Sequence, residues 1–349
     1  MRYKPGCKLW SQSSVLGPLL FIVYINDLSD VVETSQILTF ADDTKILSGI
    51  SSTDDTFQLQ KDLNNIITWS HKNNMRLNES KFELVCHRLG SENRNQKRFN
   101  NLPFQNEFYH YSTSNSDIFP SIYVRDLGIL IDNKLSWDVQ VHDVVSRARR
   151  VCAWILSVFY SRDKHVMLTL FNSLVRSKLE YCDIIWNPYK IKHISQVEGV
   201  QRYFTKKING MSNTNYWERL RLLNIMSLQR RRERNIILHL WKIKNNLTPN
   251  CVNILFKERK REKAIEAVVG ALPKVRGRAL SVYDESFSIN SARLWNLLPG
   301  ELTCRNSLNS FRLGLDKFLS QIPDEPPLTG YFSKSKTNSL VEQCLYLKR

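Results

Sequence analysis

Residues 37–47 read Ile-Leu-Thr-Phe-Ala-Asp-Asp-Thr-Lys-Ile-Leu, and this stretch decides the fold of the amino-terminal part of the chain. Two short runs of apolar and β-branched residues, Ile37–Ala41 and Thr44–Leu47, lie on either side of Asp42 and Asp43. This pattern is typical of two antiparallel strands joined by a tight turn. We therefore expect a β-hairpin that carries both aspartates at its tip.

The adjacent carboxylates of Asp42 and Asp43 need a physical explanation. Like charges at this distance repel each other, and burial of a charged carboxylate beside apolar residues is unfavourable. A divalent cation removes both penalties, and Mg²⁺ is usually bound by one or two carboxylates together with substrate phosphates. Aspartate is also a common residue of solvated turns. The pair alone leaves both interpretations open, a metal site and an ordinary turn.

A helix is predicted on each side of this hairpin. Upstream, Ser13 or Ser14 is suited to the N-cap of a helix over Ser13–Leu28, and Pro18 falls in its first turn, where proline is tolerated. The apolar run Val15–Ile25 is shorter than the ~20 residues that span a bilayer, so we expect a buried core helix. Downstream, a second helix begins at residue 54 or 55 and ends at residues 73–74, with apolar residues at helical spacing (Leu59, Leu63, Ile66 and Ile67).

The next segments are predicted from short patterns. Lys81–His87 predicts a strand, and residues 90–117, rich in Asn, Ser and Gln, predict a surface loop. Tyr123–Asp132 predicts two strands around Leu127 and Gly128. Beyond residue 137 the apolar residues recur at helical spacing and predict helix after helix. The first three apolar faces comprise Val141, Val144, Val145, Ala148, Val151, Cys152 and Ile155, then Val166, Met167, Leu170, Phe171, Leu174 and Val175, then Ile194, Val197, Val200, Gln201 and Phe204.

The last third of the chain predicts one long helix and a smaller block. Residues 227–246 form the long helix, with Ile236, Ile237, Leu240 and Trp241 on its apolar face and arginines on another side. A basic segment, Lys274–Arg278, precedes the smaller block, whose last helix we place at Ser307–Leu319. Prolines from residue 323 onward begin a tail that we expect to be mostly disordered.

Composition narrows the class of protein. The chain has 349 residues, 42% of them hydrophobic, which excludes wholesale disorder and collagen. Its seven cysteines lie far apart, so we expect reduced thiols and no zinc site. The net charge is +17, yet residues 1–60 hold four basic and seven acidic residues while residues 200–263 hold sixteen and four.

Such an excess of cations usually indicates a polyanionic partner, most often nucleic acid. In residues 200–263 the basic residues are interleaved with aromatic ones, which can stack on bases while Lys and Arg bind phosphates. A solvated helix face is the alternative explanation for the run at residues 230–232. The candidate contacts to the nucleic-acid backbone are Arg202, Lys206, Lys207, Arg230, Arg231, Arg232 and Arg234.

Several motifs give the chain a family resemblance. Residues 11–18 read Ser-Gln-Ser-Ser-Val-Leu-Gly-Pro and residues 40–44 read Phe-Ala-Asp-Asp-Thr. With Tyr24–Leu28 between them, they resemble the reverse transcriptases of non-LTR retrotransposons, particularly jockey-like and CR1-like elements. Later segments are similar to the fourth palm motif, primer-grip hairpin, thumb and C-terminal region of such elements: Leu77–Lys81, Leu127–Asp132, Leu179–Cys182, Trp186–Pro188, Val200–Arg202, Leu228–Arg232, Leu294–Pro299 and Pro323–Tyr331.

The resemblance implies roles for the motif residues. Asp42 would bind two Mg²⁺ ions, with Asp43 beside it, in the two-metal mechanism of phosphoryl transfer. That mechanism activates the primer 3′-hydroxyl and stabilises the leaving pyrophosphate.

The other motif residues would contact the substrates. Gln12 and Ser14 would lie near the incoming nucleotide and the template, and Lys81 would approach the triphosphate. Leu127 and Gly128 would hold the primer end.

The chain departs from the family pattern in two respects. A two-metal site needs a third carboxylate, which the family supplies from a strand upstream of the position of Gln12, and the residues before Gln12 contain no acid. The family's Pro-Gln-Gly-Ser reads Ser-Gln-Ser-Ser here, which adds a Cβ at Ser13. Asp27 and Asp30 follow the helix and are expected in local turn roles. We therefore expect a chain truncated before the first catalytic motif and inactive alone.

The predicted fold class is α+β. We expect a partial reverse-transcriptase palm over residues 1–135, in which an antiparallel hairpin packs on helices, followed by a helical thumb over 136–250. A small helical C-terminal block follows over 251–322, with the tail at 323–349.

The predicted function is RNA-directed DNA polymerisation, with RNA template, DNA primer and deoxynucleotide as partners and Mg²⁺ as cofactor. A nonenzymatic basic nucleic-acid-binding remnant and an unstable gene fragment are the alternatives. We expect an intracellular protein, nuclear or cytoplasmic, without a membrane or protein partner.

Overall fold

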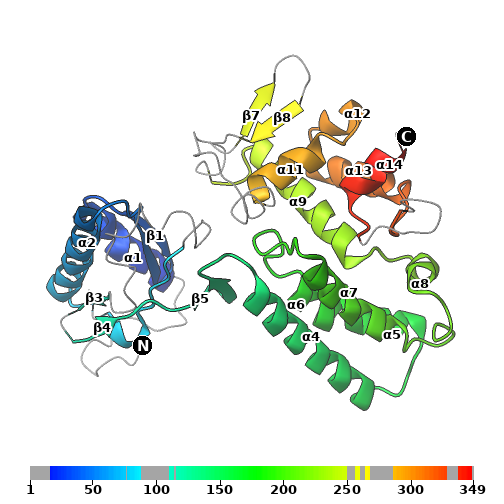
Figure 1. The fold of residues 1–349 in the computed structure, drawn as a ribbon, viewed down its shortest axis with the longest axis horizontal. Helices are drawn as coiled ribbons and strands as arrows, with labels where there is room; N and C mark the ends of the chain where they lie inside the picture. The colour runs from blue at the N-terminus through cyan, green and yellow to red at the C-terminus, as the bar shows by residue number, and fades with distance from the viewer. Residues whose placement is uncertain are drawn as a thin grey trace, which may run out of the picture. The chain divides into compact units, whose positions relative to one another are not determined.

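The computed structural model describes residues 16–75, 77–87, 110–113, 115–249, 256–259, 264–267, 286–327 and 337–347. They divide into two compact units, residues 1–124 and 125–349, and each unit is described by itself. Helices predominate, and the strands form small two-stranded sheets (Figure 1). The predicted α+β class is confirmed at this level.

The first unit combines two long helices with short hairpins. The predicted hairpin is present, and the predicted helix after it runs from Thr53 to Lys72. In chain order the elements are α1 (Leu16–Ile25), the 3₁₀ turn η1 (Asn26–Val31), β1 (Gln36–Phe40), β2 (Asp43–Leu47), α2 (Thr53–Lys72), the 3₁₀ turn η2 (Glu79–Lys81), β3 (Tyr111–Ser112) and β4 (Asp117–Ile118).

Helix α2 is the scaffold of this unit. Its N-terminus is closed by a capping box, in which the Ser52 hydroxyl accepts from the Asp55 amide and the Asp55 carboxylate accepts from the Ser52 amide. Its buried apolar residues pack under α1, η1 and the hairpins (Leu63, Ile66, Ile67 and Trp69). The hairpin of β1 and β2 therefore packs against a helix whose beginning is fixed by its cap.

The expectation that Val15–Ile25 is a buried core helix is wrong. Among the described residues of α1 only Ile25 is buried, whereas Leu19 is 59% exposed and Val23 is 74% exposed. The cause is the uniform apolar character of α1, which presents apolar side chains in every direction while the described elements cover one side.

Two further predictions in the first unit are corrected. Lys81–His87 is not a strand, because its β-type pairing in the described chain is the isolated bridge between Leu84 and Pro120. The predicted loop at 90–117 is described only in part, and there β3 pairs with β4 and buries Tyr111. The side chain of Tyr111 packs with Leu63 of α2, which gives this short hairpin its apolar anchor.

The second unit is mainly helical, as predicted. Two predicted strands around Leu127 and Gly128 form a two-stranded sheet at its beginning. Its elements are β5 (Tyr123–Asp126), at the boundary between the units, β6 (Ile129–Asp132), α4 (Asp138–Val158), α5 (Lys164–Leu170), the π-helical η4 (Phe171–Arg176), α6 (Ser177–Leu179), α7 (Ile191–Thr205), α8 (Tyr216–Leu223), α9 (Leu228–Lys244), β7 (Phe256–Arg259), β8 (Ala264–Ala267), α11 (Phe287–Trp295), α12 (Gly300–Thr303), α13 (Leu308–Ser320) and α14 (Leu340–Leu347).

The run from α5 to α6 contains a wide turn that its residue spacing explains. Met167, Phe171, Val175 and Leu179 lie four residues apart and are all at most 1% exposed. In an α-helix of 3.6 residues per turn such a series rotates off one face, whereas the wider π-helical turns of η4 keep it aligned. Val166 and Leu174, predicted on the same apolar face, are therefore partly exposed.

Helix α9 joins two apolar cores. Leu228 at its beginning packs with α4, α6 and α7 in the first core, around the fully buried Trp186. Ile236 and Trp241 farther along pack with α11, α12, α13 and α14 in the second core. Figure 1 shows α9 running from the helices of the first group to those of the second.

The C-terminal predictions are partly wrong. The helix predicted at Ser307–Leu319 is present as α13, but α14 follows it, and Leu340 of α14 is fully buried. The tail is ordered where it is described: the carboxylate of Asp324 accepts hydrogen bonds from the amide and hydroxyl of Ser227 at 2.7 and 2.8 Å. These bonds hold Ser227, whose hydroxyl caps the N-terminus of α9 by accepting from the Arg230 amide at 3.1 Å. The basic segment Lys274–Arg278 lies outside the described residues.

In the part of the chain that the structure describes, no helix is long and apolar enough to cross a membrane.

Candidate active site and basic surface

Asp42 and Asp43 lie at the tip of the β1–β2 hairpin. The last antiparallel pair is Phe40 with Asp43, so Ala41 and Asp42 form a two-residue turn. Ala41 has a φ of +53°, in the left-handed region that a residue with a Cβ rarely adopts. Both aspartates are exposed. The turn therefore presents two adjacent carboxylates to the solvent.

The two faces of this hairpin have different environments. Ile37 and Ile46 are opposite each other, half-buried, and pack against apolar residues of α2. On the other face Leu38 is 52% exposed and Phe40 is 64% exposed. Since side chains of directly paired residues share a face, Asp43 lies with Phe40 on the exposed face.

A buried carboxylate on α2 fixes the segment that leads into β1. Asp62 is fully buried, and its oxygens accept hydrogen bonds from the backbone amides of Glu33, Thr34 and Ser35 at 2.9–3.2 Å. Burial raises the pKa of Asp62, but these bonds outweigh it and lower the pKa to about 2. Asp62 is not among the predicted functional residues, although a carboxylate within the apolar stripe of a helix is a usable signal.

The donor set at the hairpin tip fits a partial magnesium site. Carboxylates are ligands that Mg²⁺ prefers, and one or two of them suffice when substrate phosphates supply other oxygens. Within the described ranges, no group of three or more His, Cys, Asp or Glu side chains is placed to hold one metal ion. The residues described here thus fit a Mg²⁺ ion bound together with phosphates, and they lack the third carboxylate of a two-metal site.

The other predicted substrate contacts are separated in the structure. Gln12 and Ser14 lie outside the described residues. Lys81 is the last residue of η2 in the first unit, and its side chain is exposed. Asp27 accepts a hydrogen bond from the Trp69 indole at 3.2 Å, a local role of the kind that the sequence predicted.

Leu127 and Gly128 form the turn between β5 and β6. Their φ angles are +43° and +84°, so both central residues are left-handed, as type I′ hairpin turns require. The Tyr181 hydroxyl donates a hydrogen bond to the Leu127 carbonyl oxygen at 2.9 Å. The turn is therefore held from outside its own sheet.

The arginines of α9, predicted as contacts to the nucleic-acid backbone, do not form an exposed basic face. Arg230 is 1% exposed, and its guanidinium donates to the backbone carbonyls of Ile322, Pro323 and Asn338. Arg232 is 2% exposed. Both side chains are enclosed by the protein, so neither is open to a phosphate in this structure.

The other two arginines of this run form ion pairs within the protein. Arg231 binds both carboxylate oxygens of Glu180, and Arg234 binds both of Asp316. Both side chains are largely buried. Each guanidinium donates two hydrogen bonds to one carboxylate, and these donors are therefore not free to bind a phosphate.

Arg232 lies in a buried network of charges between α7 and α9. Burial lowers its pKa, and the nearby carboxylates of Glu198, Asp183 and Glu233 oppose that shift. Burial raises the pKa of Glu198, raises that of Asp183 to about 6 and raises that of Glu233 to about 7.

Hydrogen bonds hold Glu198 in this network. Glu198 accepts from the Tyr216 hydroxyl and from the first two amides of α9 at 3.2 Å, which is favourable at a helix N-terminus. The buried arginines of α9, which composition alone assigned to nucleic acid, therefore take part in contacts between helices.

Exposed cations remain at the end of α7. The side chains of Arg202, Lys206 and Lys207 are exposed. Lys207 Nζ lies 5.5 Å from the centre of the Tyr203 ring, and the Arg202 guanidinium lies 4.7 Å from that of Tyr216. These three cations are the predicted phosphate contacts that the structure leaves open to a ligand.

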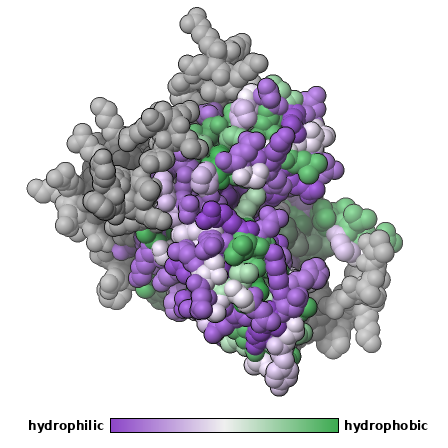
Figure 2. Space-filling view, turned by 90° about the vertical axis from the view of Figure 1, so that its right-hand side faces the viewer, coloured by the Kyte–Doolittle hydropathy of each residue, from purple (hydrophilic) through white to green (hydrophobic). Residues whose placement is uncertain are grey.

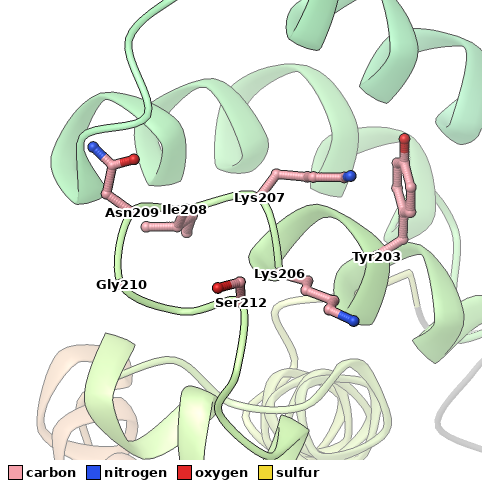
Figure 3. Close-up of a pocket in the computed structure, with 7 residues that line it drawn as sticks. All are labelled: Tyr203, Lys206, Lys207, Ile208, Asn209, Gly210 and Ser212. Carbon is pink, nitrogen blue, oxygen red and sulfur yellow. The ribbon is translucent and has the colours of Figure 1, made fainter.

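A shallow cavity lies beside them. The loop after α7 curves around a volume of about 540 Å³, with Lys206, Lys207 and Tyr203 at its edge and Gly210 and Ser212 across it (Figure 3). Gly210 has a φ of +76°, which allows the loop to reverse. Figure 2 shows one face of the molecule, on which hydrophilic side chains predominate between smaller apolar patches.

Residues 3–113 match the family described as "Reverse transcriptase (RNA-dependent DNA polymerase)". This part of the chain is therefore similar to reverse transcriptases. The matched segment contains the β1–β2 hairpin with Asp42 and Asp43, the supporting helix α2 and Lys81.

Two curated proteins are similar to the chain. One is a probable RNA-directed DNA polymerase from transposon X-element of Drosophila melanogaster, 26% identical over 207 residues, which cover 57% of this chain and 21% of that protein. The other is an uncharacterized protein of Caenorhabditis elegans, 28% identical over 112 residues, covering 31% of this chain and 57% of that protein. The chain spans about a fifth and somewhat over half of their lengths.

No solved structure matches the chain. The family match and the transposon relative confirm the resemblance to reverse transcriptases of non-LTR retrotransposons.

Proposed function

We propose that the chain is part of a retrotransposon-derived RNA-directed DNA polymerase, with residues 1–135 in its palm, 136–250 as its thumb and 251–322 as a C-terminal block. The observation that carries the proposal is the pair of exposed carboxylates at the two-residue turn of the β1–β2 hairpin, within the family match. Its substrates are an RNA template, a DNA primer and deoxynucleotides, and it acts inside the cell.

In this proposal each predicted site residue has a separate role in metal or substrate binding. Asp42 and Asp43 bind Mg²⁺, which when bound polarises the primer 3′-hydroxyl and stabilises negative charge on the leaving pyrophosphate. The capped helix α2 and the buried Asp62 fix the hairpin so that the two carboxylates keep their place. Lys81 supplies a positive charge for the triphosphate, Gln12 and Ser14 contact nucleotide and template, and Leu127 and Gly128 hold the primer end.

Replacement of Asp42 by Asn tests this proposal. The change keeps the size of the side chain and removes the negative charge that a metal requires. We expect Mg²⁺-dependent primer extension on an RNA template to fall by about 10²–10³-fold, the effect of losing one preorganised electrostatic group in an active site.

Asp54→Asn is the matched control, because Asp54 is also an exposed aspartate beside a second aspartate, at the start of α2. Its extension rate is expected to equal that of the unaltered chain. Equal activity of the Asp42→Asn variant and this control would refute the metal-binding role of the hairpin. The third carboxylate is absent from the described residues, so extension by the unaltered chain is itself an informative measurement.

A nonenzymatic nucleic-acid-binding protein is the second candidate function. The exposed cations at the end of α7 favour it, since they are independent of the metal carboxylates. Cations that contact phosphates release counterions, so the affinity of such a protein decreases steeply with salt concentration.

Replacing Lys206 and Lys207 together by Ala is expected to reduce the slope of log affinity against log salt for duplex nucleic acid by about 1.8, because each phosphate contact contributes ~0.9. Fluorescence anisotropy with a labelled duplex between 50 and 200 mM salt measures the slope. Lys178 and Lys192 are exposed lysines elsewhere in the same unit, and their double Ala variant is the control. An unchanged slope in the Lys206/Lys207 variant would exclude these residues as phosphate contacts.

A further inference from the structure

The turn of the β5–β6 hairpin is connected to a distant segment by one side chain. The Tyr181 hydroxyl donates to the Leu127 carbonyl oxygen at 2.9 Å across 54 residues of sequence. The ring of Tyr181 also lies against the other turn residue, since a Cβ on Gly128 would be 3.6 Å from its Cε1 atom. Tyr181 is thus in contact with both central residues of the turn.

This turn needs support because one of its residues is strained. Leu127 has a φ of +43°, a left-handed conformation that is disfavoured for a residue with a Cβ. Type I′ turns usually have Asn or Gly at this position. A strained conformation persists where the surrounding structure fixes it, and the hydrogen bond from Tyr181 does so at the Leu127 carbonyl.

Tyr181 is itself fixed to the core of the second unit. The indole of the fully buried Trp186 donates to the Tyr181 carbonyl oxygen at 2.8 Å. The preceding residue, Glu180, accepts both bonds of the bidentate ion pair with Arg231 of α9. The following residue, Cys182, is left-handed with a φ of +51°, which directs the chain back toward Trp186. The backbone that carries the Tyr181 ring is therefore held on both sides by contacts to the core and to α9.

We infer that Tyr181 is a positioning residue that fixes the Leu127–Gly128 turn to the helical unit. The ion pair of Glu180 with Arg231 in turn fixes the backbone next to Tyr181. The effect of Tyr181 on catalysis rests on the proposed function, in which the Leu127–Gly128 turn holds the primer end. This positioning role also explains the Leu179–Cys182 motif and Arg231 without any contact to nucleic acid.

Tyr181→Phe removes the hydroxyl and keeps the ring. We expect amide hydrogen exchange across residues 125–132 to become about fivefold faster, as the loss of one hydrogen bond predicts, while exchange in α4 and α7 stays unchanged. Tyr160→Phe is the control, because Tyr160 is 93% exposed. Unchanged exchange at residues 125–132 in Tyr181→Phe would overturn the inference, whatever the polymerase activity.

A second substitution separates position from strain. Leu127→Asn supplies a residue that accepts the left-handed conformation, so the Leu127→Asn/Tyr181→Phe double variant is expected to recover the exchange rate of the unaltered turn. If exchange in the double variant stayed as fast as in Tyr181→Phe, Tyr181 would not act by holding Leu127 in its strained conformation.

Single-nucleotide extension gives the catalytic readout. In Tyr181→Phe we expect kcat to fall about tenfold with little change in KM for the primer–template, because a displaced primer end is bound but misaligned. If the unaltered chain extends no primer, as expected where the described residues lack a third carboxylate, the exchange experiment alone decides the inference. If the chain is active and kcat in Tyr181→Phe is unchanged, the inference fails and the proposed function stands.

Discussion

Replacing Glu198 by Ala is expected to lower the free energy of unfolding of the second unit by about 3–5 kcal/mol, as removal of one partner of a buried charge pair does. Glu198 is 4% exposed and accepts hydrogen bonds from Tyr216 and from the first two amides of α9. Its removal leaves the buried guanidinium of Arg232 without one of its compensating charges. Urea unfolding followed by tryptophan fluorescence measures the change.

Glu218→Ala is the control for this substitution, since Glu218 is an exposed glutamate of α8 in the same unit. A surface change of this kind is expected to alter stability by less than about 0.5 kcal/mol. If both variants unfolded at the same urea concentration, the network around Arg232 would not be a structural element, and a role for that arginine outside the core would have to be reconsidered.

The second large effect is expected at Phe311. This residue is fully buried in the second core, with its ring centre 5.6 Å from that of Trp241 and 5.8 Å from that of Trp295, in near-parallel stacks. Phe311→Ala leaves a cavity between two indoles, and such changes typically lower the free energy of unfolding by about 3–5 kcal/mol. Amide hydrogen exchange in α11 and α13 should increase more than exchange in α4 and α7, which belong to the other core.

Leu313→Ala is the control for Phe311→Ala, because Leu313 lies on the same helix but is 65% exposed. Its unfolding midpoint is expected to match that of the unaltered chain. A loss of stability in Phe311→Ala that spread equally over both cores would mean that α9 couples them into one cooperative unit.

Local patterns of sequence predicted much of this fold correctly. The hairpin at residues 36–47 and the turn at Leu127–Gly128 are formed by short β-prone runs around turn residues. Helices α2, α4, α7 and α13 follow from apolar spacing, and Ser52 and Ser307 cap the first and the last of them. These features depend on neighbours a few residues apart, which a sequence displays directly.

The arginines of α9 show where such patterns are insufficient. A count of charges in residues 200–263 finds sixteen cations and four anions, but the carboxylates that bind Arg231 and Arg234 are Glu180 and Asp316. Those partners lie 51 and 82 residues away in the chain. A charge excess within a window indicates a ligand only for cations that remain exposed after folding, such as Lys206 and Lys207.

The same reason explains the two errors about burial. The apolar helix α1 was expected in the core, and the proline-rich tail was expected to be disordered. In the structure Val23 is exposed, while Asp324 accepts hydrogen bonds from Ser227, the N-cap of α9, and Leu340 is buried in the second core. Hydropathy states how much a segment gains from burial, but whether a partner surface exists depends on elements elsewhere in the chain.

The sequence by itself determined the resemblance of the amino-terminal part to reverse transcriptases, the hairpin that carries Asp42 and Asp43, and most helices, because short-range spacing and turn chemistry encode them. Only the tertiary structure decided which charged groups are available to a ligand and which are structural. Asp62, Glu198 and Arg232 became structural because burial in a low-dielectric interior requires partners, and only the folded chain brings those partners together.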